Sequence, residues 1–421
     1  MIKVLKKIIL LASVVLSIGI GVVSYSQILK ITGVNVDGTL PPPPPPCSTF
    51  NISGPLSSLD VGNFAGGTFP QVSQLALNIV SSSGTFGFAF KQQDVLGGGR
   101  TLHIKVGTLS PLSLIIDQTV QSWPPTAQED SGYGFGASAN GYVLNFRPDA
   151  FFQPLQRRTV LYSADNGTSL SVLNFTETVG YFLDSSSNQI GLTFDGGRFY
   201  NAYNVGGSVG PNGIAAWNHG ISNITNTPSF NVARTGFGYD GVSKVYANID
   251  PGGVSPPLLA RFAKFNGSNT VVEATFDPGF SSSDTIGGLV FGNGKLFISN
   301  FPSGVSSIKV ARVNGNPFSV EQSINLSIGD GDTYSGSRLA FDSTNNKLYL
   351  ISMAASNGRR IFRLNPTNLN VEQVATIGGA GLSFRFEDGS LHVSSNGRRM
   401  YTLEVDGNIQ HYFIREYGLC S

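Results

Sequence analysis

The sequence predicts an all-β fold assembled from repeated antiparallel units. Glycine (52 residues) and proline (22 residues) are abundant in the 421-residue chain, whereas charged residues make up only 13%. Helical bundles and coiled coils need less glycine and more lysine and glutamate. Past residue 80, short apolar alternations are separated by Gly, Asn and Asp turns, a pattern typical of β-strands.

The clearest repeat is an apolar strand ending in an aromatic residue, then a short polar turn and a second apolar strand. Clear copies begin at Phe194, Tyr239, Phe291, Phe341 and Phe386, and weaker copies begin at Phe135 and Phe90. The clear copies are 45, 52, 50 and 45 residues apart. In four of them an acidic residue follows the aromatic one: Asp195, Asp240, Asp342 and Glu387. A catalytic residue is normally unique, so this repetition predicts turn-forming carboxylates that accept backbone N–H bonds.

A second repeat relates Ser356–Leu364 to Ser395–Leu403, since both contain Ser-Asn-Gly-Arg-Arg between apolar strands. Asn-Gly between such strands is a strong hairpin signal. Together the repeats give about four antiparallel strands per unit, which resembles one blade of a β-propeller. The resemblance covers roughly residues 85–420. It is closer to the degenerate blades of extracellular bacterial propellers than to kelch or WD40 blades, whose signatures are missing. It implies about seven blades, with six or eight as alternatives.

The first thirty residues carry the pattern of an export signal. Three lysines precede the uncharged segment Ile8–Leu29, and small residues before Gln27 favour cleavage there, so that residues 1–26 form a signal peptide. The alternative is an uncleaved membrane anchor made by residues 8–29. Both interpretations place the rest of the chain outside the cytoplasm, so we expect an extracellular or cell-surface protein.

A linker follows the export segment. Residues 27–46 end in six prolines, Pro41–Pro46, which form a stiff polyproline rod. The propeller region then spans residues 47–421. Within it, residues 47–83 supply either a strand that closes the ring beside the C-terminal strand or a small β-extension.

The two cysteines, Cys47 and Cys420, bracket the folded region. In an oxidising compartment an isolated pair is most simply one disulfide, which would bring the two ends of a closed ring together. Intermolecular bridges and free thiols are the alternatives.

Charge and composition exclude several classes of function. The net charge is +1, without the positive excess of a nucleic-acid binder. Four histidines and two cysteines are too few for a multi-ligand zinc site or an iron–sulfur cluster. Asp330 and Asp332 resemble a fragment of a calcium loop but lack its other ligands, so a turn is the simpler interpretation. We therefore predict no cofactor, with calcium as a weak candidate at these two residues.

Two features are candidate ligand contacts. Arg359, Arg360, Arg398 and Arg399 occupy matching hairpins, and on one face their guanidinium groups would form a patch for carboxylate, sulfate or phosphate groups. The alternative is that they pair with nearby acids. Trp217 and His219 lie in an unusual loop, where an exposed tryptophan could stack on a sugar ring and a packed one would only hold the loop.

No catalytic motif is apparent, and we predict no catalytic residue. The expected function is non-enzymatic recognition or adhesion, in which an exported propeller binds a glycan or an extracellular protein. One alternative is a polysaccharide hydrolase or lyase with a pair of non-repeated carboxylates at the channel mouth. Another is a membrane-anchored envelope or virion structural protein that keeps residues 8–29 as its anchor.

Overall fold

The computed structural model describes residues 50–419 except 51, 53, 64–70, 81–82, 94–98, 124–132, 139–140, 147–154, 178–180, 183–191, 195–198, 206–212, 218–224, 227–230, 240–243, 251–257, 264–271, 281–284, 328, 330, 357 and 387–389. The predicted export segment, the proline rod and both cysteines lie outside this part of the chain. Within it, no helix has the length and apolar character needed to cross a membrane.

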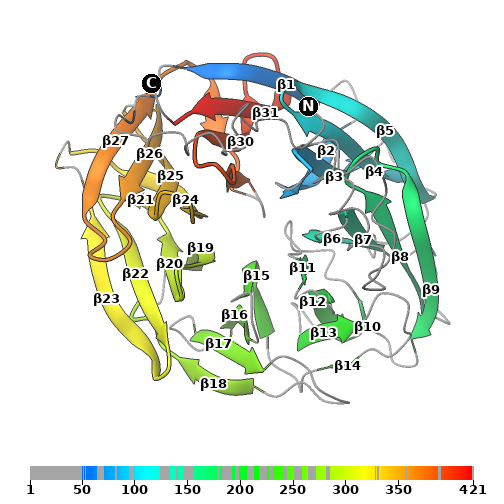
Figure 1. Cartoon of the computed structure of the whole chain (residues 1–421), viewed down its shortest axis with the longest axis horizontal. Helices are drawn as coiled ribbons and strands as arrows, with labels where there is room; N and C mark the ends of the chain where they lie inside the picture. Colours follow the sequence, from blue (N-terminus) through cyan, green and yellow to red (C-terminus); the bar gives the residue numbers. More distant parts are fainter. Residues whose placement is uncertain are drawn as a thin grey trace, which may run out of the picture. The chain divides into compact units, whose positions relative to one another are not determined.

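The described strands form seven antiparallel sheets, here called blades 1 to 7 (Figure 1). Blade 1 contains β2 (Gln71–Val80), β3 (Thr85–Gln93), β4 (Arg100–Leu109) and β5 (Leu112–Trp123). Blade 2 contains β6 (Tyr133–Ser138), β7 (Gly141–Phe146), β8 (Leu155–Ser163) and β9 (Ser169–Glu177). Blade 3 contains β10 (Tyr181–Phe182), β11 (Leu192–Phe194), β12 (Phe199–Val205), β13 (Gly213–Trp217) and β14 (Thr225–Asn226).

Blade 4 contains β15 (Asn231–Tyr239), β16 (Lys244–Asp250), β17 (Leu258–Ala263) and β18 (Val272–Phe276). Blade 5 contains β19 (Thr285–Gly292), β20 (Lys295–Phe301), β22 (Ile308–Gly315) and β23 (Phe318–Leu326). Blade 6 contains β24 (Tyr334–Asp342), β25 (Lys347–Ala354), β26 (Gly358–Leu364) and β27 (Val371–Ile377), and the short β21 (Ser303–Val305) pairs with β24.

Blade 7 joins the two ends of the described chain. It contains β28 (Leu382–Phe384), β29 (Leu391–Val393), β30 (Arg399–Asp406), β31 (His411–Gly418) and β1 (Pro55–Asn63). β1 pairs antiparallel with β31, so residues 55–63 are the outer strand of the blade that holds the C-terminal strand. β28 and β29 both pair with β30 and are two pieces of one inner strand.

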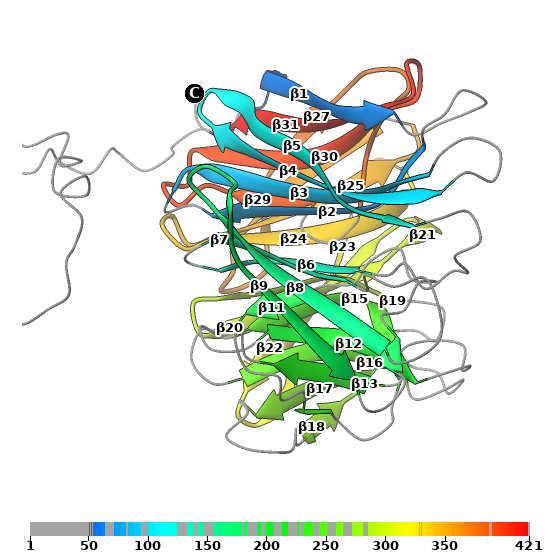
Figure 2. The same cartoon turned by 90° about the vertical axis from the view of Figure 1, so that its right-hand side faces the viewer.

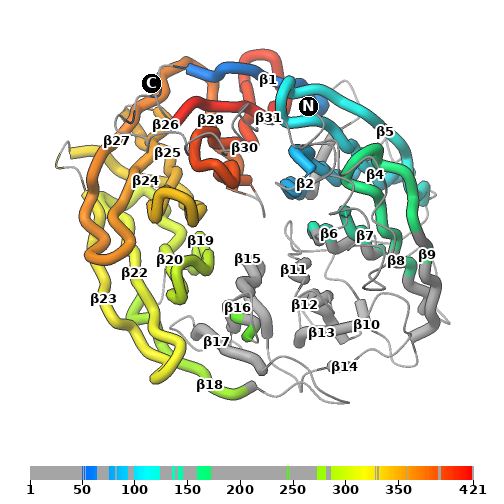
Figure 3. The backbone as a smooth tube through the Cα atoms, viewed as in Figure 1, coloured from blue at the N-terminus to red at the C-terminus, as the bar shows by residue number. Residues whose placement is uncertain are grey.

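The blades follow one another in chain order around a common centre (Figure 1), and Figure 2 shows the same sheets from the side. Inner strands of neighbouring blades contact each other: β2 with β6, β6 with β11, β11 with β15, β15 with β19, β19 with β24, and β24 with β29. One buried cluster joins blade 7 to blade 1, with Leu403 and Ile414 packed among Phe86 and Phe88. The buried apolar clusters of the described residues therefore lie between facing sheets. Figure 3 shows the backbone of the same arrangement as a tube. The predicted all-β architecture of about seven blades is confirmed.

A complete blade runs from an inner strand through a second and a third strand to an outer strand. Because successive strands are antiparallel, the inner-to-second and third-to-outer turns lie at one end of the blade, here called end A. The second-to-third turns and the links between blades lie at the other, end B. At end A, the side-chain amide of Asn345 donates to the carbonyl of Gly397, 3.4 Å away in blade 7.

The acidic residue of the repeat forms the turn at end A of blade 6. Asp342 is buried, and its Oδ1 accepts the backbone N–H groups of Thr344 (3.0 Å) and Asn345 (3.1 Å). Its Oδ2 accepts the Asn345 side-chain amide at 2.8 Å. The turn-forming role is confirmed for Asp342. The other three acids of the repeat lie outside the described residues.

Two repeat assignments in the sequence are wrong. β28 ends at Phe384, β29 begins at Leu391, and both pair with β30, so Phe386 lies between two pieces of the inner strand and the copy beginning there is not an inner-to-second turn. The copy beginning at Phe90 lies inside β3, the second strand of blade 1. Local sequence could not reveal either shift, because Gly- and Asp-containing turns look alike at both ends of a blade.

Candidate functional site

The predicted arginine patch is wrong for blade 6, because Arg359 and Arg360 are buried. Arg359 is only 1% exposed and forms an ion pair with Glu404. It also donates to the Tyr417 hydroxyl at 3.2 Å and to a backbone carbonyl at 3.0 Å. Arg360 donates to Thr376 and lies 3.6 Å from a carboxylate oxygen of Asp332. The Arg359 guanidinium joins blade 6 to blade 7, whereas that of Arg360 bonds within blade 6 and to the link that precedes it, and neither is exposed.

The two arginine pairs also lie at opposite ends of their blades. The hairpin before Arg359 joins β25 to β26 at end B, whereas the hairpin before Arg399 joins β29 to β30 at end A. Arg399 pairs with Glu416 at 3.3 Å, and the backbone carbonyl of the half-buried Arg398 accepts the N–H of Leu419 at 2.9 Å. The four residues therefore do not form one surface.

The weak calcium candidate is engaged in other bonds. Asp332 is buried, and its Oδ1 accepts the backbone N–H groups of Thr333 (3.0 Å) and Ser356 (2.9 Å) beside the Arg360 guanidinium. This carboxylate holds the link between blades to the second-to-third turn of blade 6. No group of three potential metal-ligating side chains occurs among the residues that the structure describes.

Of the other candidate residues, Trp217 alone lies in the described part of the chain. Trp217 is the last residue of β13, where its backbone lies opposite Phe199. His219, Asp330, Cys47 and Cys420 fall outside the described residues.

A recurring set of charged residues, not predicted from the sequence, lies at end A of blades 4 to 6. The second strand of each blade begins with a lysine that forms an ion pair with a glutamate of the outer strand: Lys244 with Glu273, Lys295 with Glu321, and Lys347 with Glu372. Two residues after each lysine is an aromatic residue, which lies opposite an arginine of the third strand: Tyr246 opposite Arg261, Phe297 opposite Arg312, and Tyr349 opposite Arg363. We call this lysine, aromatic, arginine and glutamate set the frame. Its sequence signal is Lys, an apolar residue and an aromatic one at the start of each second strand.

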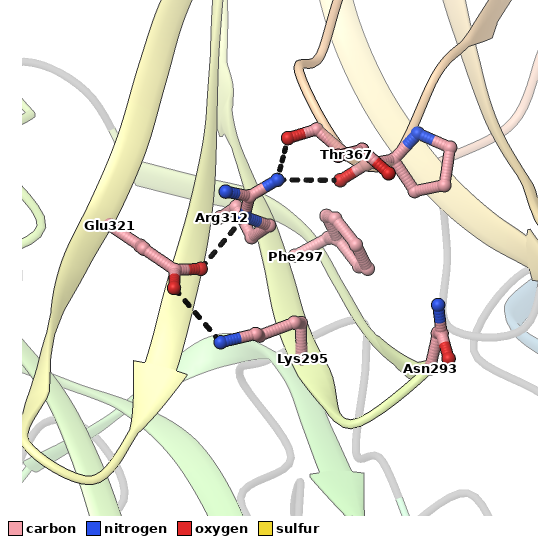
Figure 4. Close-up of a pocket in the computed structure, with 7 residues that line it drawn as sticks. Asn293, Lys295, Phe297, Arg312, Glu321 and Thr367 are labelled. Atoms are coloured by element: carbon pink, nitrogen blue, oxygen red, sulfur yellow. Dashed lines mark hydrogen bonds and ion pairs between the residues drawn. The ribbon is translucent and has the colours of Figure 1, made fainter.

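The frame of blade 5 forms the floor of a pocket (Figure 4). The pocket has a volume of about 220 Å³ and is lined by Asn293, Lys295, Phe297, Arg312, Glu321, Pro366 and Thr367. Pro366 and Thr367 come from the third-to-outer turn of blade 6, so the pocket lies between two blades at end A.

Mutual bonds hold the charged groups of the pocket in place. One Glu321 oxygen accepts Lys295 Nζ at 2.9 Å, and the other accepts Arg312 Nε at 2.8 Å. Arg312 Nη1 also donates to the carbonyls of Pro366, at 3.1 Å, and Thr367. The hydrogen bond from the Lys295 ammonium lowers the pKa of the Glu321 carboxyl group. Desolvation opposes this shift, and Arg312 adds to it. The site is therefore a recess of mutually bonded charged side chains with the Phe297 ring in its lining.

No family model and no curated protein matches the sequence. Among solved structures, the chain is similar to the WD40 domain of Toxoplasma gondii coronin, with a TM-score of 0.54 and 10% identity over 90% of this chain and 88% of that chain. It is similar to the Dos1 propeller, with a TM-score of 0.50 and 10% identity over 87% of this chain and 95% of that chain. It also matches Kuenenia stuttgartiensis hydrazine synthase, with a TM-score of 0.52 and 10% identity over 84% of this chain and 99% of that chain. The protein has the β-propeller fold. At this identity the likeness extends to the fold alone.

Proposed function

We propose that the protein is an exported recognition module that binds an extracellular protein partner through the pocket at end A of blades 5 and 6. The observation that carries this proposal is the pocket itself, a recess that combines two cations, one carboxylate and an aromatic base. Such a mixture of a few placed polar groups with an apolar wall is typical of sites that select a ligand.

A protein partner suits the pocket better than a glycan. Three of the lining side chains, Lys295, Arg312 and Glu321, are charged, and they complement the charged side chains of a protein better than the neutral hydroxyl groups of a sugar. These charged groups are already bonded to one another, which keeps their positions fixed before a partner arrives. A preorganised site of this kind loses less conformational entropy on binding.

Export is part of the proposal and rests on the N-terminal sequence pattern. A disulfide between Cys47 and Cys420 is also part of the proposal. Phe50 and Leu419, which are three residues and one residue away from these cysteines, belong to one buried cluster. Intact-mass measurement of the secreted chain, with and without a reductant, tests both points. We expect a chain starting at Gln27 that gains about 2 Da on reduction, and a chain starting at Met1 or two alkylatable thiols would contradict them.

A selection experiment tests the function. The full chain is screened against a library of random displayed peptides and against a glycan array, beside Thr367→Trp, which places a large side chain in the pocket. Asn370→Trp is the matched control, since it adds the same side chain to the same exposed turn outside the lining. We expect selected peptides to bind the native chain and Asn370→Trp equally and Thr367→Trp at least about tenfold more weakly. Selected peptides that bind Thr367→Trp as tightly as the native chain, or turnover of a glycan, would overturn the proposal.

A further inference from the structure

Three equivalent slots lie above the frames of blades 4, 5 and 6, and their occupants differ. In each slot, one wall is the frame and the other is the chain segment that leads into the outer strand of the next blade. The slot of blade 4 holds Phe318, the first residue of β23. Its ring centroid is 5.8 Å from that of Tyr246 and 4.4 Å from that of Phe276, in an edge-to-face contact. An aromatic side chain of the next blade thus fills this slot.

The slot of blade 6 holds Phe50. The centroid of the Phe50 ring lies 5.9 Å from that of the Tyr349 ring. The Arg363 guanidinium lies over the Phe50 ring, 5.4 Å from its centroid. The Phe50 backbone N–H donates to Gln373 Oε1 at 3.1 Å. Blade 7 has no third-to-outer turn, because its outer strand is β1 and comes from the other end of the chain. The segment before β1 supplies the aromatic side chain instead.

The slot of blade 5 is the pocket. The turn of blade 6 that faces it, residues 365–370, reads Asn-Pro-Thr-Asn-Leu-Asn and contains no aromatic residue. Leu369 of this turn is buried in the same cluster as Phe297, and the space of about 220 Å³ lies beside Pro366 and Thr367 of the same turn. A cavity of roughly 150 Å³ is enough to bind benzene. The open space can therefore take an aromatic side chain like those in the two neighbouring slots.

The charge of the pocket indicates what should flank that side chain. Lys295 and Arg312 carry two positive charges against the single negative charge of Glu321, and side-chain exposures of 32%, 16% and 34% leave all three within reach of a partner. An acidic residue beside the aromatic one would complement the remaining positive charge.

We infer that this pocket binds an aromatic side chain of a partner's peptide segment, with an acidic residue next to it, in the way that Phe50 fills the equivalent slot of blade 6. This inference rests on the proposed function and names the partner chemistry. A partner of this kind would supply the aromatic group that the turn of blade 6 lacks, and Arg312 would lie over its ring as Arg363 lies over Phe50.

The test uses a probe copied from the chain itself. The peptide acetyl-Ser-Thr-Phe-Asn-Ile-Ser-amide reproduces residues 48–53, and it is titrated into the full-length protein by NMR beside the Phe50→Ala and Asn51→Asp versions of the peptide. We expect the Phe50→Ala peptide to bind at least about tenfold more weakly. The Asn51→Asp peptide should bind about threefold more tightly at low salt, and this gain should shrink in 0.5 M salt as the charges are screened.

Protein variants locate the binding. Thr367→Trp should weaken the native peptide at least about tenfold, while Asn370→Trp should leave it unchanged. No binding of the native peptide up to about 5 mM, equal binding of the Phe50→Ala peptide, or indifference to Thr367→Trp would each overturn the inference. If the library instead yields pocket-dependent peptides without aromatic residues, the proposed function stands and the inference fails. If the probe binds in the pocket but no library peptide does, the pocket chemistry stands and the proposed function fails.

Discussion

Blades 5 and 6 carry the same frame of lysine, aromatic residue, arginine and glutamate, yet one slot is open and the other is filled. Blade 5 faces an ordinary turn of the next blade, whereas blade 6 faces a blade assembled from both chain ends. The difference extends to the interior. Arg359 of blade 6 occupies the register position that Ile308 has in blade 5, so an ion pair replaces an apolar contact. Repetition of the sequence therefore fixes the frame, and the neighbouring blade decides what lies above it.

The largest expected effect comes from breaking the ion pair that distinguishes blade 6. Glu404 is fully buried, and its carboxylate binds Arg359, Arg415 at 3.4 Å and the Tyr417 hydroxyl at 2.5 Å. Glu404→Gln leaves two buried guanidinium groups without their counter-charge, so urea unfolding should show a loss of about 4 kcal/mol. Glu416→Gln, which removes the partner of the more exposed Arg399, should cost about 1 kcal/mol. Equal losses would mean that burial does not set the strength of these pairs.

The next largest effect is expected when the side chain that fills the slot of blade 6 is removed. Phe50→Ala removes a side chain that is only 9% exposed and packs on Tyr349 beneath Arg363. We expect a loss of about 3 kcal/mol in the free energy of unfolding, from lost burial and the cavity left behind. Thr367→Trp, on the exposed turn of the open slot, should change stability by less than about 0.5 kcal/mol. A Phe50→Ala protein as stable as the native chain would show that Phe50 is not an integral part of blade 6.

Lys91 is buried, whereas the lysines of the frame are partly exposed. Burial, and then the Arg100 charge, lower the pKa of Lys91 to about 7. Its pKa in the folded state is below that in the unfolded state, so the unfolded chain binds more protons between these two values and stability rises with pH there. The stability of the native chain relative to Lys91→Met should therefore rise by about 2 kcal/mol between pH 7 and 9. A difference that stays constant over this range would contradict the burial argument.

The smallest expected change in stability comes from removing the glutamate of the frame in blade 5 or in blade 6. Bonding to Lys295, aided by Arg312, lowers the pKa of Glu321, so its contribution to stability is fully present above the unfolded value near 4.5 and is lost as the pH falls through the folded value. Because Glu321 is about one-third exposed, Glu321→Gln should cost only about 0.5 kcal/mol at pH 7 and nothing at pH 2. Glu372→Gln, at the less exposed equivalent position in blade 6, should cost more at pH 7. The reverse order would indicate that the open pocket strengthens the pairing of its own charges.

The sequence predicts the blades because each copy of the repeat carries its own turn chemistry. Asp342 shows this most clearly, since its bonds reach only three residues along the chain. The burial and ion pairing of Arg359 could not be predicted in this way, because its partner Glu404 lies 45 residues away in the next blade. Burial of an arginine in a hairpin depends on the sheet that faces it.

The pocket could be predicted only in part. The lysine and aromatic residue at the start of each second strand are visible in the sequence. Their arginine and glutamate partners come from other strands, and register shifts after Arg312 and Arg363 break the spacing that would relate them. That one slot stays open follows from the residues of a turn in the next blade, which no local pattern links to Phe297.

The central claim is that the open slot of blade 5 and the filled slot of blade 6 are equivalent. The most direct test uses the peptide copied from residues 48–53 with a fluorinated phenylalanine, so that ¹⁹F NMR reports each kind of bound site. The account predicts one bound signal with the native chain, two with Phe50→Ala, and only the new one when Phe50→Ala is combined with Thr367→Trp. No bound signal with the native chain, or a single unchanged signal after Phe50→Ala, would contradict it.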